Sequence, residues 1–290
     1  MMQDKQDAAS GTSYERAVLR MQSDPDRQDF VKQCYLDDPL DAALRFAASD
    51  EFREVCRILS IAAGGKKLRV LDVGCGNGIA SYAFASMGCD VVAMEPDPSP
   101  VVGTGAVNRL KDELKSGTIV SACCPVGNYK DDQGFDIVYA RQVAHHFPVL
   151  EEGVSACAGL LRAGGTFLMT REHVADTPED LESFRQKHAL AQDGVWECAY
   201  PSARYREAMR SAGLSDIREW GPFDSVINYY PAPAEKIRGK AHDMMRARYG
   251  RIGGLLFRGL PAVERWAVHR LSELNRSPGR MYSFLGRKRG

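Results

Sequence analysis

The segment 70–78 reads VLDVGCGNG, an apolar run followed by a loop with glycine at every second position, Gly74, Gly76 and Gly78. Glycine lacks a Cβ atom, so such a loop lets a ligand approach the backbone closely. The dinucleotide-binding pattern G-x-G-x-x-G/A fails at Ile79, and the phosphate-loop pattern G-x-x-x-x-G-K-S/T is absent. The loop therefore disfavours binding of NAD or of the ATP phosphates.

A carboxylate follows the next apolar run. Residues 91–94 end in Glu95, which lies 17 residues after Gly78. A carboxylate at the end of a second strand can accept hydrogen bonds from both ribose hydroxyls of an adenosine. A glycine loop and a ribose acid without a phosphate site predict a nucleoside ligand that carries no pyrophosphate.

Strand-like and helix-like stretches alternate along most of the chain, a pattern typical of an α/β protein with a parallel, doubly wound sheet. The predicted strands are 69–73, 91–94, 118–122, 136–139, 166–170, 217–220 and 223–229. We therefore expect a Rossmann-like, mostly parallel seven-stranded sheet, with a helical lid before it and a basic helical extension after it.

Composition divides the chain into four predicted parts. Residues 1–13 lack an apolar period and are expected to be disordered, and 14–63 form the helical lid, with Ser49 as a helix cap. Residues 64–230 form the ligand-binding domain, with elements for a second substrate at 174–212. Residues 231–290 are the extension, which carries 14 Lys and Arg against 4 Asp and Glu, a charge of +10 in a chain whose net charge is zero.

The glycine loop resembles the first motif of the class I S-adenosylmethionine-dependent methyltransferases. Three further motifs fit that family in order and spacing: AMEPDPS at 93–99, FDIVYARQVAHHF at 135–147 and LLRAGGTFLM at 160–169. The resemblance spans residues 68–172. It implies S-adenosylmethionine as the cofactor and S-adenosylhomocysteine as its product.

The resemblance also implies which residues hold this cofactor. Many relatives bind the adenine amine with an acid before the fourth strand, but this chain has no acid at 123–128, so backbone groups or Asn128 must substitute. Arg141 is expected to contact either the methionine carboxylate or a neighbouring helix. Tyr35, Arg45 and Phe46 are candidates to close the lid over the cofactor. The full predicted set is Asp72, Gly74, Cys75, Gly76, Asn77, Gly78, Glu95, Pro96, Asp97, Val126, Arg141 and Tyr35.

Methyl transfer from a sulfonium requires mainly alignment and exclusion of water, and an oxygen or nitrogen acceptor often also needs a general base. Acceptors in this architecture lie above the carboxyl ends of the strands. His145, His146 and His173 follow two such strands and are the candidate bases. The adjacent His145 and His146 are not expected to face one pocket together, so one of them could instead pack against or cap the following helix.

Residues 171–173 read Arg-Glu-His directly after a buried strand, where they suit either an acceptor pocket or an ion pair that holds the loop. The predicted acceptor-binding residues are Arg171, Glu172, His188, Tyr200 and Tyr229. A metal site of His145, Glu172 and His173 would have only generic spacing. The eight cysteines include no CxxC pair and no Cys/His zinc spacing, so we expect free thiols and no metal.

The basic extension could attract an anionic surface, a membrane or a phosphate-bearing acceptor, or it could simply present a solvated face. The face formed by Val263, Trp266, Ala267, Leu271 and Leu274 is expected to dock on the core of the domain. Nucleic acid is disfavoured because no RNA-binding module is present. The polar amino terminus and the lack of long apolar runs predict a cytoplasmic location.

These features together predict an S-adenosylmethionine-dependent methyltransferase that acts on a small molecule or glycan, at oxygen. Two alternatives stay open. The fold could bind the same cofactor but catalyse a non-methylating displacement or cyclisation, which would release methylthioadenosine. The chain could also be a non-catalytic partner subunit, although the intact glycine loop and Glu95 argue against that role.

Overall fold

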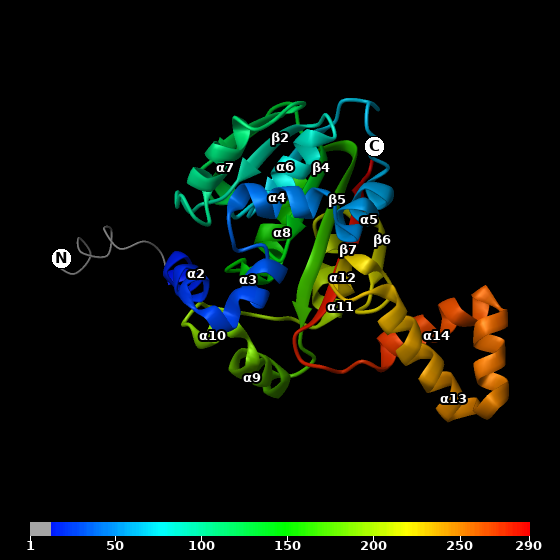
Figure 1. Ribbon diagram of the computed structural model, residues 1–290. Coiled ribbons are helices and arrows are strands. Elements are labelled where there is room, and N and C mark those ends of the chain that lie inside the picture. Colours follow the sequence, from blue (N-terminus) through cyan, green and yellow to red (C-terminus); the bar gives the residue numbers. More distant parts are fainter. Residues whose placement is uncertain (1–12) are drawn as a thin grey trace.

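A seven-stranded sheet organises the computed structural model, which describes residues 13–290 (Figure 1). The strand order is β3-β2-β1-β4-β5-β7-β6, and only β7 runs antiparallel to its neighbours. The strands are β1 Arg69–Val73, β2 Asp90–Met94, β3 Thr118–Ala122, β4 Phe135–Arg141, β5 Leu161–Val174, β6 Leu214–Trp220 and β7 Arg280–Lys288. The predicted α/β fold with a mostly parallel, doubly wound sheet is confirmed.

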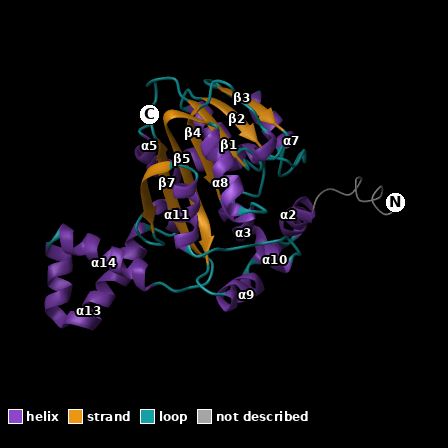
Figure 2. Ribbon diagram, turned by 180° about the vertical axis from the view of Figure 1, so that it is seen from behind, coloured by secondary structure: helices purple, strands orange, loops and turns teal. Residues whose placement is uncertain are grey.

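Helices cover both faces of the sheet (Figure 2). Neighbouring residues of β1 point to opposite layers, because side chains alternate along a strand: Val70 packs into one core and Leu71 into the other. The first core lies under α4 Pro39–Ala47, α5 Asp50–Leu59, α6 Ile79–Ser86 and α7 Thr104–Lys111, and the second under α8 Leu150–Gly159 and α11 Ser202–Ser211. This burial explains why apolar residues predominate in the central strands.

The segment before β1 is helical, as predicted. It begins with α2 Ser13–Ser23, the short turn η1 Pro25–Arg27 and α3 Gln28–Gln33, and continues into α4 and α5. Ser49 caps α5, because its Oγ accepts a hydrogen bond from the N–H of Phe52 at 3.1 Å. The tail predicted to be disordered, 1–13, lies outside the described residues except for Ser13.

The seventh strand is formed by other residues than those predicted from the sequence. Residues 223–229 were expected to be a strand, but Ser225 caps a short helix there, α12 Val226–Tyr229. The strand β7 comes instead from the end of the extension, which was expected to be helical to residue 290. Phe284 and Leu285 of β7 are buried in opposite cores, so this strand is an integral part of the sheet.

The rest of the extension forms a helical hairpin of α13 Ala234–Gly259 and α14 Pro261–Leu274, which projects away from the sheet in both ribbon views (Figures 1 and 2). The chain breaks the helical path at Gly250 inside α13. The apolar face of α14 was expected to dock on the domain core. It packs instead against α13 through Val263, Ala267 and Leu271, and it leaves Trp266 and Leu274 exposed. Within residues 13–290, no helix is long and apolar enough to cross a membrane.

The remaining elements lie around the carboxyl ends of the parallel strands. The turn η2 Val126–Asn128 precedes β4, and η3 Ala144–His146 follows it. After β5 come α9 Pro178–Lys187 and α10 Ala189–Gln192. Figure 1 shows α2, α3, α9 and α10 gathered at this end of the sheet, where they surround the loops described next.

Candidate functional site

The glycine loop connects β1 to α6 with a backbone that requires glycine. Gly74 and Gly76 have φ values of 60° and 54°, in the left-handed region that side chains disfavour. A Cβ atom at Gly74 would lie only 2.7 Å from Val143, whereas one at Gly76 would meet nothing closer than 3.8 Å. Gly74 is therefore required for packing, whereas a Cβ atom at Gly76 would only reach ordinary van der Waals contact with the Val102 carbonyl.

The structure brings Glu95 to this loop. Its Oε2 accepts a hydrogen bond from the Gly76 N–H at 3.2 Å, and its Oε1 accepts one from the Asp97 N–H at 3.2 Å. The parallel register of β1 and β2, with Val73 opposite Met94, places the two strand ends side by side. Burial raises the pKa of Glu95, while the two backbone hydrogen bonds act in the opposite direction. A carboxylate and the glycine loop thus meet at the carboxyl ends of β1 and β2.

Asp72 lies beneath the loop. It is 1% exposed, and its carboxylate accepts a hydrogen bond from the Ser81 Oγ at 2.6 Å. Burial raises the pKa of Asp72 to about 7. The side chain therefore ties the end of β1 to α6, and its contact with the methionine end of a cofactor stays a prediction.

The lid contacts the loop through Tyr35. Its backbone carbonyl accepts a hydrogen bond from the Asn77 Nδ2 at 2.7 Å. Ser99, after β2, donates to Glu15 of α2 at 2.8 Å, which holds the first helix over the same edge. The other two lid candidates do not face the loop: Phe46 is fully buried among apolar side chains, and Arg45 pairs with Asp37 at 2.7 Å.

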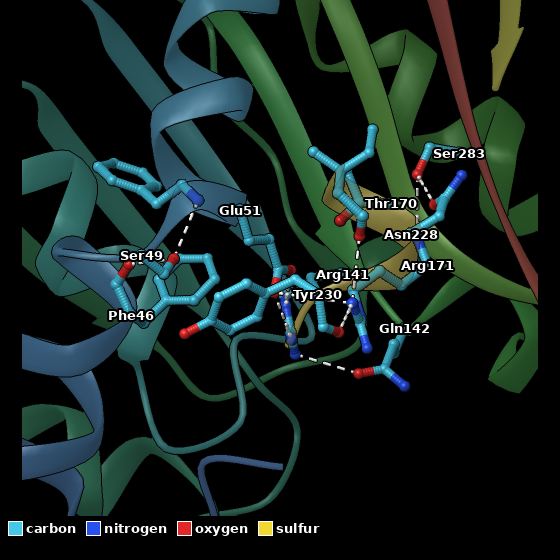
Figure 3. A network of polar contacts seen from close by, with 12 residues as sticks. Phe46, Ser49, Glu51, Arg141, Gln142, Thr170, Arg171, Asn228, Tyr230 and Ser283 are labelled. Atoms are coloured by element: carbon cyan, nitrogen blue, oxygen red, sulfur yellow. Dashed lines mark hydrogen bonds and ion pairs between the residues drawn. The ribbon is translucent and has the colours of Figure 1, made fainter. Parts of the chain in front are cut away.

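Two arginines converge on a single buried acid beside the site (Figure 3). Arg141, at the end of β4, binds Glu51 of α5 through two hydrogen bonds, of 2.7 and 3.2 Å. Arg171 of β5 lies 3.8 Å from the same carboxylate and donates to the carbonyls of Ile227 and Tyr230. Of the two roles left open for Arg141, the structure shows contact with a neighbouring helix.

A cluster of imidazoles and carboxylates occupies the ends of β4 and β5. Glu172 accepts hydrogen bonds from the backbone N–H groups of Val143, Ala144 and His145 and contacts the His145 Nδ1 at 2.6 Å. Glu172 is fully buried, so the structure favours its loop-holding role over the acceptor contact. Burial lowers the pKa of His145, but Glu172 and Glu197 outweigh this effect and raise it to about 9.

The other members of the cluster come from later segments. His173 follows Glu172 on β5, and its Nδ1 lies 2.9 Å from the Gly279 carbonyl. Burial and then the neighbouring His145 lower the pKa of His173, and the same two causes lower that of His146 to about 4. His188 and Glu197, from the segment after β5, complete the group. The sequence singled out all four histidines but missed Glu197, because no local pattern marks it.

The remaining candidates lie at varied distances from this edge. Val126 is buried in the second core, and Cys123 of the same segment contacts the Pro96 carbonyl at 3.5 Å. Tyr200 packs against Tyr205 and under the Arg204 guanidinium. Tyr229 lines a separate cavity of about 410 Å³ between α12, α13 and the segment that leads into β7. The structure thus does not bring Tyr229 to the glycine loop.

Comparison with known proteins gives one family match. The profile described as a methyltransferase domain matches residues 47–219. A ubiquinone biosynthesis O-methyltransferase from Bradyrhizobium sp. (strain ORS 278) is 29% identical over 127 residues, which are 44% of this chain and 47% of that relative. The chain spans about half the length of the curated relatives it matches.

Solved structures share the fold. A phosphoethanolamine N-methyltransferase 2 from Haemonchus contortus, bound to phosphomonomethylethanolamine and S-adenosylhomocysteine, superposes with a TM-score of 0.51 at 18% identity, covering 83% of this chain and 52% of that one. The [4+2]-cyclase SpnF has a TM-score of 0.50 at 17% identity, with coverages of 81% and 80%. Identities this low show a common fold and leave the reaction open.

Proposed function

The chain belongs to the methyltransferase-domain family, and on that premise we propose that it transfers the methyl group of S-adenosylmethionine to an oxygen of a small molecule or glycan. The observation that carries the proposal is the pairing of Glu95 with the glycine loop at Gly76. This pairing places a carboxylate that can accept hydrogen bonds from a ribose next to the glycine loop expected to line the rest of the cofactor. The O-methyltransferase relatives support oxygen as the acceptor atom.

The reaction needs few protein groups. The acceptor oxygen forms a bond to the methyl carbon as the bond from that carbon to sulfur breaks, and the neutral S-adenosylhomocysteine leaves. The hydroxyl proton must go to a base or to solvent. Among the histidines at the strand ends, His146 has 37% of its side chain exposed, while His145 and His173 are buried. His146 is therefore the imidazole that an acceptor can reach.

The first test is a substrate screen. The purified protein is incubated with methyl-labelled S-adenosylmethionine and a panel of phenols, catechols and glycans, and the products are identified by mass spectrometry. A methylated acceptor with an equal amount of S-adenosylhomocysteine supports the proposal. Methylthioadenosine would favour the non-methylating reaction, and cofactor binding without turnover on any acceptor would favour a non-catalytic subunit.

We expect His146→Ala to lower turnover by about 10², because a positioned base contributes at least this much to proton transfer. Affinity for S-adenosylmethionine should be unchanged, since His146 is not part of the glycine loop or its lid contacts. The measurement is kcat with the identified acceptor, alongside calorimetry of cofactor binding. His269→Ala, which removes an exposed imidazole on α14, is the matched control. Near-native turnover in His146→Ala would exclude this residue as the base.

A further inference from the structure

Four of the six histidines in the chain gather at one place, around the Glu197 carboxylate. The Nε2 atoms of His145 and His146 each lie 3.7 Å from Glu197 Oε2, and the Nδ1 of His188 lies 3.8 Å from Oε1. One ligand atom each from His145, His173 and Glu197 falls within 4.8 Å of the others, and all three residues are buried. Imidazole nitrogens and a carboxylate that converge in this way are the donor set of many transition-metal sites.

The two buried histidines of this set are oriented by outer contacts. His145 bonds to Glu172 through Nδ1, and His173 bonds to the Gly279 carbonyl through Nδ1, so each ring keeps its Nε2 free for the centre of the cluster. Glu172 is itself held by three backbone N–H groups. Metal-binding histidines almost always have such a partner on the second nitrogen, because it fixes the tautomer and the direction of the lone pair.

Two atoms in the cluster lack a hydrogen bond from the described part of the chain, although imidazole nitrogens lie 3.7 to 3.8 Å from the Glu197 carboxylate. Glu197 Oε2 and His188 Nδ1 are buried and make no hydrogen bond within the described residues 13–290. The Glu197 side chain is only 2% exposed. Buried polar atoms are rarely left without a partner, and a buried carboxylate oxygen is best satisfied by a cation.

We propose that His145, His173 and Glu197 bind a divalent first-row transition metal ion. Bonds of about 2.0 to 2.2 Å to N and O ligands separate neighbouring tetrahedral ligands by about 3.4 Å. The 3.7 Å between His145 and Glu197 is close to this spacing. Three protein ligands leave a fourth position open, as in catalytic metal sites.

The open position suggests a role that rests on the proposed function. The cluster lies at the strand ends where the methyl acceptor is expected, and the exposed His146 borders it. A hydroxyl bound to the ion would lose its proton more easily, and the resulting oxygen anion is a better methyl acceptor. Metal binding itself does not depend on this role, and the two are tested separately.

The binding test uses the full chain after treatment with a chelator. The protein is incubated with Zn²⁺, Mn²⁺ or, under anaerobic conditions, Fe²⁺, then desalted and assayed by elemental analysis and calorimetry. We expect one ion per chain. Glu197→Gln and His173→Ala should each weaken binding at least a hundredfold, and Glu172→Gln should weaken it ten- to a hundredfold through the loss of the outer contact. His269→Ala, outside the cluster, should bind as the wild type does.

Circular dichroism establishes that each variant is folded, and visible bands of bound Co²⁺ report the coordination independently. No bound ion in the folded wild type, or equal binding by wild type and Glu197→Gln, would overturn the proposal. The role of the ion in the reaction is tested separately. If metal-free protein methylates its acceptor at the full rate, the ion has no role in the reaction, but the metal site stands. If the protein binds metal and transfers no methyl group, the result counts against the proposed function alone.

A second and independent observation concerns the tip of the helical hairpin, residues 246–260. Ile252 and Leu255 are each 70% exposed, and Tyr249, Leu256 and Leu260 are also exposed. Both ribbon views show this hairpin directed away from the sheet (Figures 1 and 2). The tip contains four arginines and no acid, and none of these arginines forms an ion pair with the described part of the chain. The arginines are Arg246, Arg248, Arg251 and Arg258.

We infer that the hairpin tip docks on an anionic phospholipid surface. Apolar side chains flanked by unpaired cations match the interface of such a surface, where the apolar groups enter the headgroup boundary and the cations meet lipid phosphates. A protein partner or a second copy of the chain would instead need acidic side chains opposite the four arginines. A second copy has few acids on its own hairpin to offer, and one of them, Glu264, is already paired with Arg238.

The test is sedimentation with vesicles of phosphatidylcholine alone or mixed with phosphatidylserine. We expect the full chain to bind only the anionic vesicles, and we expect rising salt to release it as the Debye length shortens. Arg248→Gln and Arg251→Gln should each weaken binding about fivefold. Leu255→Ser should also weaken it, whereas Arg53→Gln, on α5, should not. Absence of binding at low salt, equal binding to both vesicles, or a dimer in solution that Leu255→Ser dissociates would each overturn the inference.

Discussion

Replacing Glu95 with alanine should weaken S-adenosylmethionine binding at least a hundredfold. The carboxylate is expected to accept hydrogen bonds from two ribose hydroxyls, and bonds to a charged group contribute about 1.5 to 3 kcal/mol each. Glu95 also holds the Gly76 N–H in place, so its loss releases the loop that lines the rest of the site. Isothermal titration calorimetry with the purified variant measures the effect directly.

The matched control for Glu95 is Asp90, at the other end of the same strand. Asp90 pairs with the exposed Lys67 and lies away from the glycine loop, so Asp90→Ala should keep the wild-type affinity for the cofactor. Thermal unfolding without ligand separates a binding defect from a folding defect. Unchanged affinity in folded Glu95→Ala would mean that the cofactor binds elsewhere.

The parts of the site that the sequence could predict are those with local signals. The glycines at 74, 76 and 78 and the acid at 95 follow two apolar runs, and neighbouring parallel strands bring their carboxyl ends to the same edge. The topology therefore places Glu95 against the loop without any knowledge of side-chain contacts. The same reasoning placed His145 and His173 together, because β4 and β5 are also parallel neighbours.

The parts that the sequence could not predict depend on long-range packing. Nothing near Glu51 distinguishes it from an ordinary acid in the first turn of a helix, and its importance comes from arginines 90 and 120 residues away. Glu197 lies in a segment without regular structure and acquires its neighbours only when α9 and α10 fold back over the strand ends. Local periodicity carries no information on either contact.

The prediction of the seventh strand was wrong for a different reason. Residues 280–288 combine a short apolar run with three cations, and they follow two helices, so composition favoured a continued helical extension. The strand forms because β5 offers a long free edge and β7 pairs with it antiparallel, from Val174 opposite Arg280 to Thr166 opposite Arg287. Tertiary context overrode local preference here, as is common for strands.

Neutralising Glu51 should destabilise the fold by about 3 to 5 kcal/mol, because removal of one partner from a buried ion pair leaves an uncompensated charge. In Glu51→Gln the amide keeps the shape of the side chain, but Arg141 and Arg171 lose the carboxylate that they share. Both guanidinium groups are largely buried, so water cannot replace the lost interaction. Urea unfolding followed by circular dichroism measures the change in the free energy of unfolding.

Two further variants test whether the buried charge causes this loss of stability. Asp50→Asn alters the neighbouring acid of α5, which is exposed and paired with the exposed Arg53, and such a pair contributes less than about 1 kcal/mol. The double variant Glu51→Gln with Arg141→Met removes one of the two stranded charges and should recover part of the lost stability. If Glu51→Gln costs no more than Asp50→Asn, the buried network does not anchor α5 to the sheet. The lid would then be held by its apolar contacts and by the hydrogen bond between Asn77 and Tyr35.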